Sequence, residues 1–173
     1  MHDFWVFGYG SLMWNPGFHY DFVLPARLFG YHRALCIYSN HYRGTVDNPG
    51  LVLGLDRGGC CDGLAFHVPS SDTQKTYDYL IEREQINSVY IEKQRPIHLN
   101  DGRIVTGLFF VADQTHEQYA TKLDLNEMAT IIRKSHGLAG SNRDYVINTA
   151  ISLKKIGIHD RFLERLEKLL QDK

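Results

Sequence analysis

A glutamate near the end of a predicted helix, Glu84, has the position expected of a catalytic base. Residues advance about 100° each around an α-helix, which places Glu84 roughly 20° from Tyr77 and roughly 40° from Leu80. Those two residues belong to an apolar stripe, so the Glu84 carboxylate is predicted to face the protein interior. Glu82 lies about 160° from Glu84 on the same wheel and is predicted to face water.

Burial changes what the Glu84 carboxyl can do. An apolar setting disfavours the charged form and raises the pKa of a carboxyl toward the range useful for proton transfer near neutral pH. Glu84 is therefore a candidate general base. Two other interpretations stay open: fraying of the last helical turn would leave Glu84 in water, and Arg83 or another cation could simply pair with it.

The second candidate is the glycine-rich run Gly8-Tyr9-Gly10-Ser11-Leu12, which follows a short apolar strand. Glycines let a backbone approach a ligand closely, and amides beyond a strand end can hold an anion or a developing oxyanion. Met13 stands where a dinucleotide-binding fingerprint needs its third glycine and where a G-x-S-x-G nucleophile elbow needs its closing glycine. A phosphate-binding loop also fails, because no Gly-Lys-Ser/Thr follows.

The histidines and cysteines lack metal-binding spacing. None of the nine histidines has a partner at H-x-x-x-H spacing, and no two of the three cysteines are separated by two residues. We expect neither a metal nor a cofactor. The odd cysteine count, with Cys60 and Cys61 adjacent, argues against a disulfide framework and fits a reducing compartment.

Length and charge limit the class of protein. The chain has 173 residues, 43% of them hydrophobic, and we expect one domain spanning residues 1–173. Lys and Arg number 19 against 20 Asp and Glu, so no basic field exists to attract nucleic acid. No apolar run approaches the ~20 residues that cross a bilayer, and no basic signal region opens the chain. We therefore expect a cytoplasmic protein with neither a nucleic-acid nor a membrane partner.

The elements that would position these residues fall into two groups. Strand patterns occupy the first two thirds of the chain and helical spacing the last third. This order predicts an α+β fold, a small curled antiparallel β-sheet or barrel with flanking helices, rather than a parallel doubly wound sheet. A short strand that breaks into a tight turn is predicted within 4–12, one or two strands within 26–39, and further strands at 88–99 and 103–112. Residues 51–68 are predicted to form a hairpin that turns at Gly58 and Gly59.

Capping signals mark the predicted helix starts. Ser71 and Gln74 form a capping box that opens the helix ending near Glu84. Asp124 and Glu127 form a second candidate cap, and after a glycine-rich break a further helix restarts at residue 141 or 142. Leucines at positions 163, 166 and 170 give the last helix an apolar face that is predicted to pack on the domain.

Several motifs together resemble a known family. The segment from Val6 to Pro16, V-F-G-Y-G-S-L-M-W-N-P, resembles the N-terminal signature of the ChaC-like γ-glutamylcyclotransferases, cytosolic enzymes that degrade glutathione. Further matches follow in family order and span nearly the whole chain. They are S-x-x-x-R-G at 39–44, P-G-x-V at 49–52, G-C-x-x-G-x-A at 59–65, Y-L-x-x-R-E at 79–84 and G-x-x-G-x-N-x-x-Y at 137–145.

The resemblance implies roles for individual residues. Glu84 matches the glutamate that serves the family as proton acceptor, and Tyr145 matches a hydroxyl of the substrate pocket. Backbone amides and the Ser11 hydroxyl would hold the γ-glutamyl group. The substrate loop that supplies them comprises Phe7, Gly8, Tyr9, Gly10, Ser11 and Leu12.

The resemblance also implies a reaction and a fold. The α-amine of glutathione would attack its own γ-carbonyl, closing 5-oxoproline and releasing Cys-Gly, without a cofactor or a metal. The implied fold is a small α/β unit around a curled antiparallel barrel. Two alternatives stay open: a cyclotransferase for other γ-glutamyl amino acids or amines, and a non-catalytic module that only binds a γ-glutamyl ligand.

Overall fold

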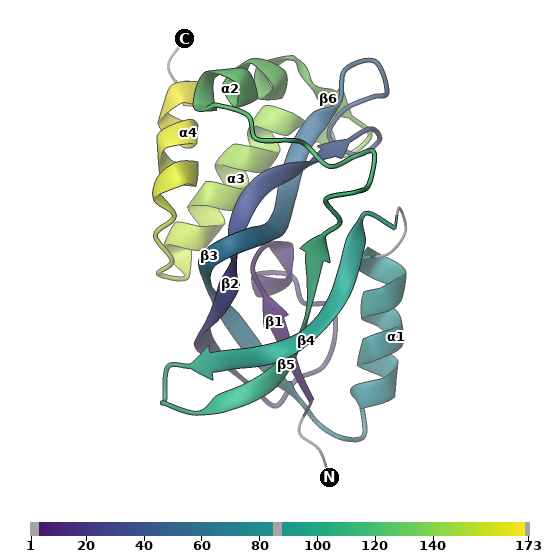
Figure 1. Cartoon of the computed structure of the whole chain (residues 1–173), viewed down its shortest axis with the longest axis vertical. Helices are drawn as coiled ribbons and strands as arrows, with labels where there is room; N and C mark the ends of the chain where they lie inside the picture. Colours follow the sequence, from purple (N-terminus) through teal and green to yellow (C-terminus); the bar gives the residue numbers. More distant parts are fainter. Residues whose placement is uncertain (1–3, 85–87, 172–173) are drawn as a thin grey trace. The chain divides into compact units, whose positions relative to one another are not determined.

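The computed structural model describes residues 4–84 and 88–171 (Figure 1). Contacts divide the chain into two compact units, one made of residues 1–34 and 54–114 and the other of residues 35–53 and 115–173. The sequence-based expectation of a single domain stays a prediction. None of the helices among the described residues is long and apolar enough to cross a membrane.

Five strands form a closed barrel. They are β1 (Phe4–Gly8), β2 (Phe22–Ser39), β3 (Gly50–Val68), β4 (Tyr90–Leu99) and β5 (Ile104–Ala112), in the order β1-β3-β2-β4-β5. The β4–β5 hairpin turns at Asp101 and Gly102 as predicted, with Gly102 at a φ of 91°. The barrel confirms the predicted fold class. One pairing differs from an all-antiparallel sheet, because β1 is antiparallel to β3 but parallel to β5.

The predicted hairpin within residues 51–68 is wrong. The segment is one continuous strand, β3, whose barrel neighbour β2 is almost as long. Gly58 and Gly59 do adopt positive φ angles, 95° and 70°. They bend the strand without reversing it, as glycines at bulges do, and the Gly58 carbonyl lies 3.0 Å from the His32 ring nitrogen of β2. A glycine pair therefore signals positive φ but does not by itself distinguish a turn from a bend.

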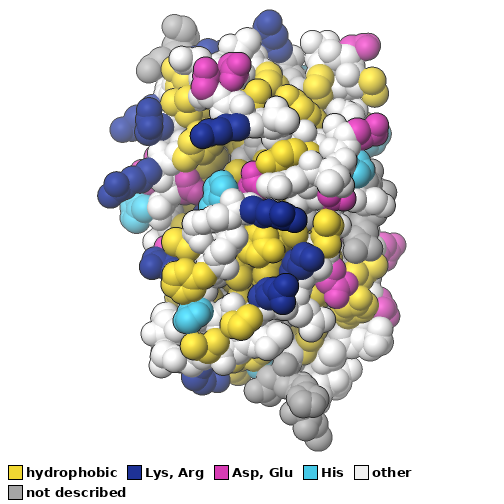
Figure 2. Space-filling model, in the orientation of Figure 1, with side chains coloured by type: hydrophobic (Ala, Val, Ile, Leu, Met, Phe, Trp, Pro, Cys, Tyr) yellow, Lys and Arg dark blue, Asp and Glu magenta, His cyan; other side chains and the backbone are white. Residues whose placement is uncertain are grey.

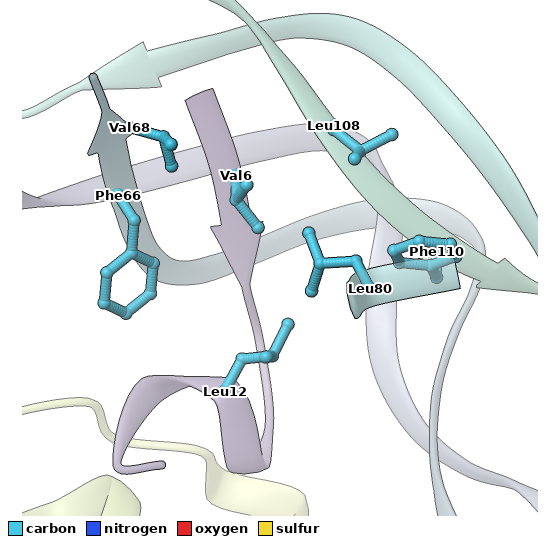
Figure 3. Packing of buried hydrophobic residues seen from close by; sticks show 7 residues of the cluster. All are labelled: Val6, Leu12, Phe66, Val68, Leu80, Leu108 and Phe110. Atoms are coloured by element: carbon cyan, nitrogen blue, oxygen red, sulfur yellow. The ribbon is translucent and has the colours of Figure 1, made fainter. Parts of the chain in front are cut away.

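A cluster of buried hydrophobic side chains connects the barrel to the helix α1 (Thr73–Glu84) (Figure 3). Leu80 of α1 is fully buried, and Leu12 joins the same cluster from a short 3₁₀ turn, η1 (Ser11–Met13). Burying one such side chain stabilises the fold by about 1.5–3 kcal/mol. The packing therefore fixes two segments at once: the end of β1 with its following turn, and the last turns of α1. The cluster consists of Val6, Leu12, Phe66, Val68, Leu80, Leu108 and Phe110.

Helix α1 has the predicted register, although it begins one position late. Its first backbone hydrogen bond runs from the Thr76 amide to the Asp72 carbonyl. Asp72, rather than Ser71, therefore holds the N-cap position. The helix ends at Glu84, with Glu82 exposed to solvent and Leu80 buried, as the helical wheel requires.

The second unit contains the remaining helices. They are α2 (Leu125–Lys134), α3 (Asn142–Lys155) and α4 (Arg161–Gln171), with a two-stranded ribbon of β6 (His136–Gly137) and β7 (Gly140–Ser141) before α3. Asp124 and Glu127 form the predicted capping box, and Ser141 caps α3 through the Asp144 amide. The predicted leucine face of α4 is buried. Basic and acidic side chains both occur on the face shown in Figure 2, in keeping with the balanced composition.

Candidate active site

Glu84 is the last residue of α1, and its carboxylate is largely sheltered. Its side chain is 18% exposed, whereas Glu82 two residues earlier is open to solvent. Burial raises the pKa of Glu84 above its ordinary value, and the neighbouring Arg83 guanidinium opposes this rise. The carboxylate is thus neither fully solvated nor isolated, because Arg83 Nε lies 3.4 Å from Glu84 Oε1. A sheltered carboxylate whose pKa is raised is suited to accept a proton near neutral pH.

The Arg83 guanidinium contacts the segment that follows β1 as well as Glu84. Its Nη2 donates a hydrogen bond to Ser11 Oγ at 3.0 Å. Its Nη1 donates to the backbone carbonyls of Asn15, at 2.9 Å, and Pro16, at 3.3 Å. One cation therefore lies between the candidate base and the glycine-rich loop.

The substrate loop divides into buried side chains and accessible backbone. Phe7 and Leu12 are 1% and 6% exposed and belong to the core, so they can offer a ligand only their backbone groups. Ser11 is exposed and opens η1, where the first amides of a helical turn have no acceptor within the turn. The Tyr9 carbonyl accepts a hydrogen bond of 2.6 Å from Nε of Arg33, a buried arginine of β2.

Close backbone packing explains two glycines of this region. A Cβ on Gly63 would collide with the Gly8 carbonyl oxygen and approach the Phe7 ring within 2.7 Å. A Cβ on Gly8 would lie 3.2 Å from Leu12 Cβ, because η1 folds directly back over the end of β1. Gly63 thus lets β3 approach β1 closely, and Gly8 leaves room for the η1 side chains against the end of β1.

Tyr145 and Asn142 lie on α3, in the second unit. The Tyr145 hydroxyl accepts a hydrogen bond of 3.1 Å from the Leu53 amide, and the Arg43 guanidinium lies 5.3 Å from its ring centre. Asn142 is fully buried, with its amide bonded to both the N–H and the C=O of Leu51 at 2.7 Å each. The role of Tyr145 as a pocket hydroxyl stays a prediction.

Sequence reasoning did not identify the two arginines that hold the loop, Arg33 and Arg83. Arg33 lies within a strand pattern of mostly apolar residues. A charged residue in such a run indicates a buried side chain that is paired with hydrogen-bond acceptors. The sequence predicts Arg83 as a possible partner of Glu84 and as part of the Y-L-x-x-R-E motif, but not its contact with Ser11, which spans 72 residues of sequence. Among the described residues no group of three or more His, Cys, Asp or Glu side chains is placed to hold a metal ion. The expected absence of a metal stays a prediction.

Comparison with known proteins assigns this chain to a family. The chain matches the ChaC-like protein family over residues 4–173. The glutathione-specific gamma-glutamylcyclotransferase of Escherichia coli (strain K12) is 34% identical over 162 residues, covering 94% of this chain and 70% of that protein. This chain belongs to the ChaC-like family.

Further similarity to ChaC-like proteins extends to yeast. The glutathione-specific gamma-glutamylcyclotransferase of Schizosaccharomyces pombe (strain 972 / ATCC 24843) is 34% identical over 173 residues, covering 88% of this chain and 83% of that protein. The crystal structure of a yeast gamma-glutamyl cyclotransferase specific to glutathione superposes with a TM-score of 0.86 at 23% identity. That alignment covers 98% of this chain and 96% of the yeast chain, so this ChaC-like chain has the same fold.

Proposed function

We propose that this protein cleaves glutathione to 5-oxoproline and Cys-Gly, with Glu84 as the general acid and base. The observation that carries the proposal is the sheltered Glu84 carboxylate, which shares the Arg83 guanidinium with the Ser11 hydroxyl of the glycine-rich loop. Two relatives that are 34% identical are named glutathione-specific gamma-glutamylcyclotransferases, which supports the choice of substrate.

The reaction begins with a proton transfer. An α-amino group has an ordinary pKa of about 8, so near neutral pH bound glutathione is largely an ammonium that cannot attack. Glu84 takes one proton from the ammonium, and the freed amine forms a bond to the γ-carbonyl carbon. Glu84 gives that proton to the cysteine nitrogen as the bond from the γ-carbonyl carbon to that nitrogen breaks. The attacking nitrogen then loses its second proton to the same carboxylate, which passes it to the departing amine, so 5-oxoproline leaves with a neutral lactam nitrogen, Cys-Gly leaves as an ammonium and no water is consumed.

The loop supplies geometry and charge stabilisation. The γ-glutamyl chain must be folded so that its two ends meet, and holding it in that shape removes an entropic barrier. In our proposal the backbone of residues 7–12 and the Ser11 hydroxyl hold the γ-glutamyl group, and the amides that open η1 stabilise the oxyanion. We also infer that the protein works in the reducing cytoplasm, where its three cysteines are thiols.

The pH dependence of kcat/KM should report the raised pKa of Glu84. The base must be ionised, so activity should rise with pH as Glu84 loses its proton. Because burial raises the pKa of Glu84, the midpoint of the acid limb should lie above the ordinary glutamate value of 4.5. Initial rates of 5-oxoproline formation in overlapping buffers measure this midpoint, and a limb at or below 4.5 would contradict the assignment.

The direct test is incubation of the purified protein with glutathione, followed by mass spectrometry. Equal amounts of 5-oxoproline and Cys-Gly are expected. The α-linked tripeptide Glu-Cys-Gly is the matched control: its amine has no γ-amide to attack, so it should release no Cys-Gly. A panel of γ-glutamyl amino acids and amines tests the broader cyclotransferase alternative. Calorimetric binding of glutathione without any product would instead identify a γ-glutamyl-binding module.

A further inference from the structure

We propose that Arg83 is a positioning residue that orients the Ser11 hydroxyl toward the γ-carbonyl oxygen of the substrate and fixes the 11–16 segment against the helix that carries Glu84. The inference rests on the proposed function, because it concerns the same site. In this proposal Arg83 neither accepts the proton of the substrate, as Glu84 does, nor binds the γ-glutamyl group directly, as the loop of residues 7–12 does.

The contacts of Arg83 favour positioning over substrate binding. A guanidinium has five N–H donors and no acceptor. Arg83 directs Nη2 to Ser11 and Nη1 to the Asn15 carbonyl and, at 2.8 Å, to the Tyr79 hydroxyl, while Nε faces Glu84. Its side chain is 22% exposed. Its nitrogens are thus directed at protein acceptors, which leaves Arg83 poorly placed to bind a substrate carboxylate bidentately.

The direction of the Arg83–Ser11 bond determines what Ser11 can do. Arginine only donates, so Ser11 Oγ accepts from Nη2 and its own hydroxyl proton must point elsewhere. A hydroxyl that accepts a charge-assisted hydrogen bond becomes a stronger donor itself. Ser11 is exposed, so its hydroxyl proton is available to an incoming oxygen. The γ-carbonyl oxygen gains negative charge as the amine attacks, and it is the acceptor that such a donor would stabilise most.

The same guanidinium anchors the turn that follows Ser11. The Asn15 and Pro16 carbonyls both accept from Nη1, which also donates to the Tyr79 hydroxyl. Gly17, at a φ of 76°, lies so close to Tyr79 that a Cβ there would collide with the hydroxyl. The segment 11–17 therefore lies directly on α1, and its position depends on the Arg83 fork.

Arg83 also acts on Glu84 by its charge. Within the described residues, the charged group that lies beside the Glu84 carboxyl is the Arg83 guanidinium. The same guanidinium donates a hydrogen bond to the Tyr79 hydroxyl, which is also titratable. The two effects can be separated by substitution. Lysine at position 83 retains the charge but lacks the planar fork, whereas methionine removes both.

The test compares R83K, R83M, S11A and the S11A/R83M double variant, with R165M as the control, because Arg165 is a solvent-exposed arginine of α4. We expect kcat for glutathione to fall about 10-fold in R83K with the acid limb unmoved. In R83M it should fall about 10²-fold, with the acid limb moved to higher pH because Arg83 no longer favours the carboxylate. KM should change by less than kcat in both. S11A should cost activity in the wild-type background and almost none in R83M, because the hydroxyl is no longer oriented.

A second measurement follows the loop without relying on activity. Hydrogen exchange of the amides of Met13, Trp14 and Asn15, which bond within the turn, should speed up in R83M and not in R165M. Unchanged exchange in R83M would overturn the positioning role whether or not glutathione is cleaved. If the wild-type protein cleaves glutathione and the fold-losses of kcat in S11A and R83M multiply in the double variant, the positioning role of Arg83 is contradicted while the proposed function stands. No 5-oxoproline from the wild-type protein would overturn the proposed function instead.

Discussion

Replacing Glu84 by glutamine should lower kcat for glutathione cleavage by about 10²–10⁴-fold, the usual contribution of a general acid–base group. Glutamine keeps the size of the side chain but cannot accept the α-ammonium proton. Steady-state rates of 5-oxoproline formation measure the loss. Glu82→Gln is the matched control two residues away: that side chain is exposed, so near-native turnover is expected.

The same substitution should not destabilise the protein at neutral pH. Burial raises the pKa of Glu84, so the fold favours the protonated carboxyl. The resulting stability is fully present below the unfolded pKa and is lost as pH rises through the folded pKa. Because glutamine does not titrate, the unfolding temperature of Glu84→Gln should match or exceed that of the wild type near pH 7.

The two measurements together distinguish catalysis from folding. A large fall in activity with an unchanged unfolding temperature is expected for a catalytic base held in a sheltered position. An inactive variant that also melts well below the wild type would point to a structural role for Glu84. Retained turnover would remove Glu84 from the mechanism altogether.

Replacing Asn142 by alanine should give the largest loss of stability among single polar substitutions in α3. The Asn142 amide satisfies both the N–H and the C=O of Leu51, which is itself fully buried. Alanine leaves both backbone groups without that partner, at a cost of about 1–3 kcal/mol each. For a chain of this length each kcal/mol lowers the unfolding temperature by roughly 2–4 °C. Thermal unfolding followed by circular dichroism measures the shift.

Asn126→Ala provides the control for that experiment. Asn126 also lies in the first turn of a helix, α2, but it is exposed. The two variants share their chemical change and their place in a helix, so they differ mainly in burial. Equal unfolding temperatures for the two variants would show that the Asn142–Leu51 bonds add little to the stability of the fold.

Periodicity predicted the position of Glu84 well. The helical wheel depends only on 3.6 residues per turn and on the apolar stripe, and α1 kept that register up to its last residue. The glycines before Ser11 predict a backbone that a ligand can approach closely, and that role stays a prediction. In the structure Gly8 packs against the side chains of Leu12, Met13 and Phe66. The helical register of Glu84 is a local feature, and a local pattern predicts it.

Features that depend on distant partners could not be predicted in this way. Gly58 and Gly59 allow either a turn or a bent strand, and the long neighbouring strand β2 decides between them. The parallel pairing of β1 with β5 likewise depends on barrel closure, which no segment encodes alone. Arg83 shows the same limit in the site: only the folded chain brings its guanidinium to Ser11.

The pairing of β1 with strands on both sides has a consequence for a chain still on the ribosome. The strand that leads into the glycine-rich loop is synthesised before both of its partners, yet it has to insert between β3 and β5, which ends at Ala112. A nascent polypeptide therefore carries Ser11 and Glu84 long before it can hold them in a working arrangement. Translation must pass the end of β5 before any newly made copy can close the barrel beside that loop.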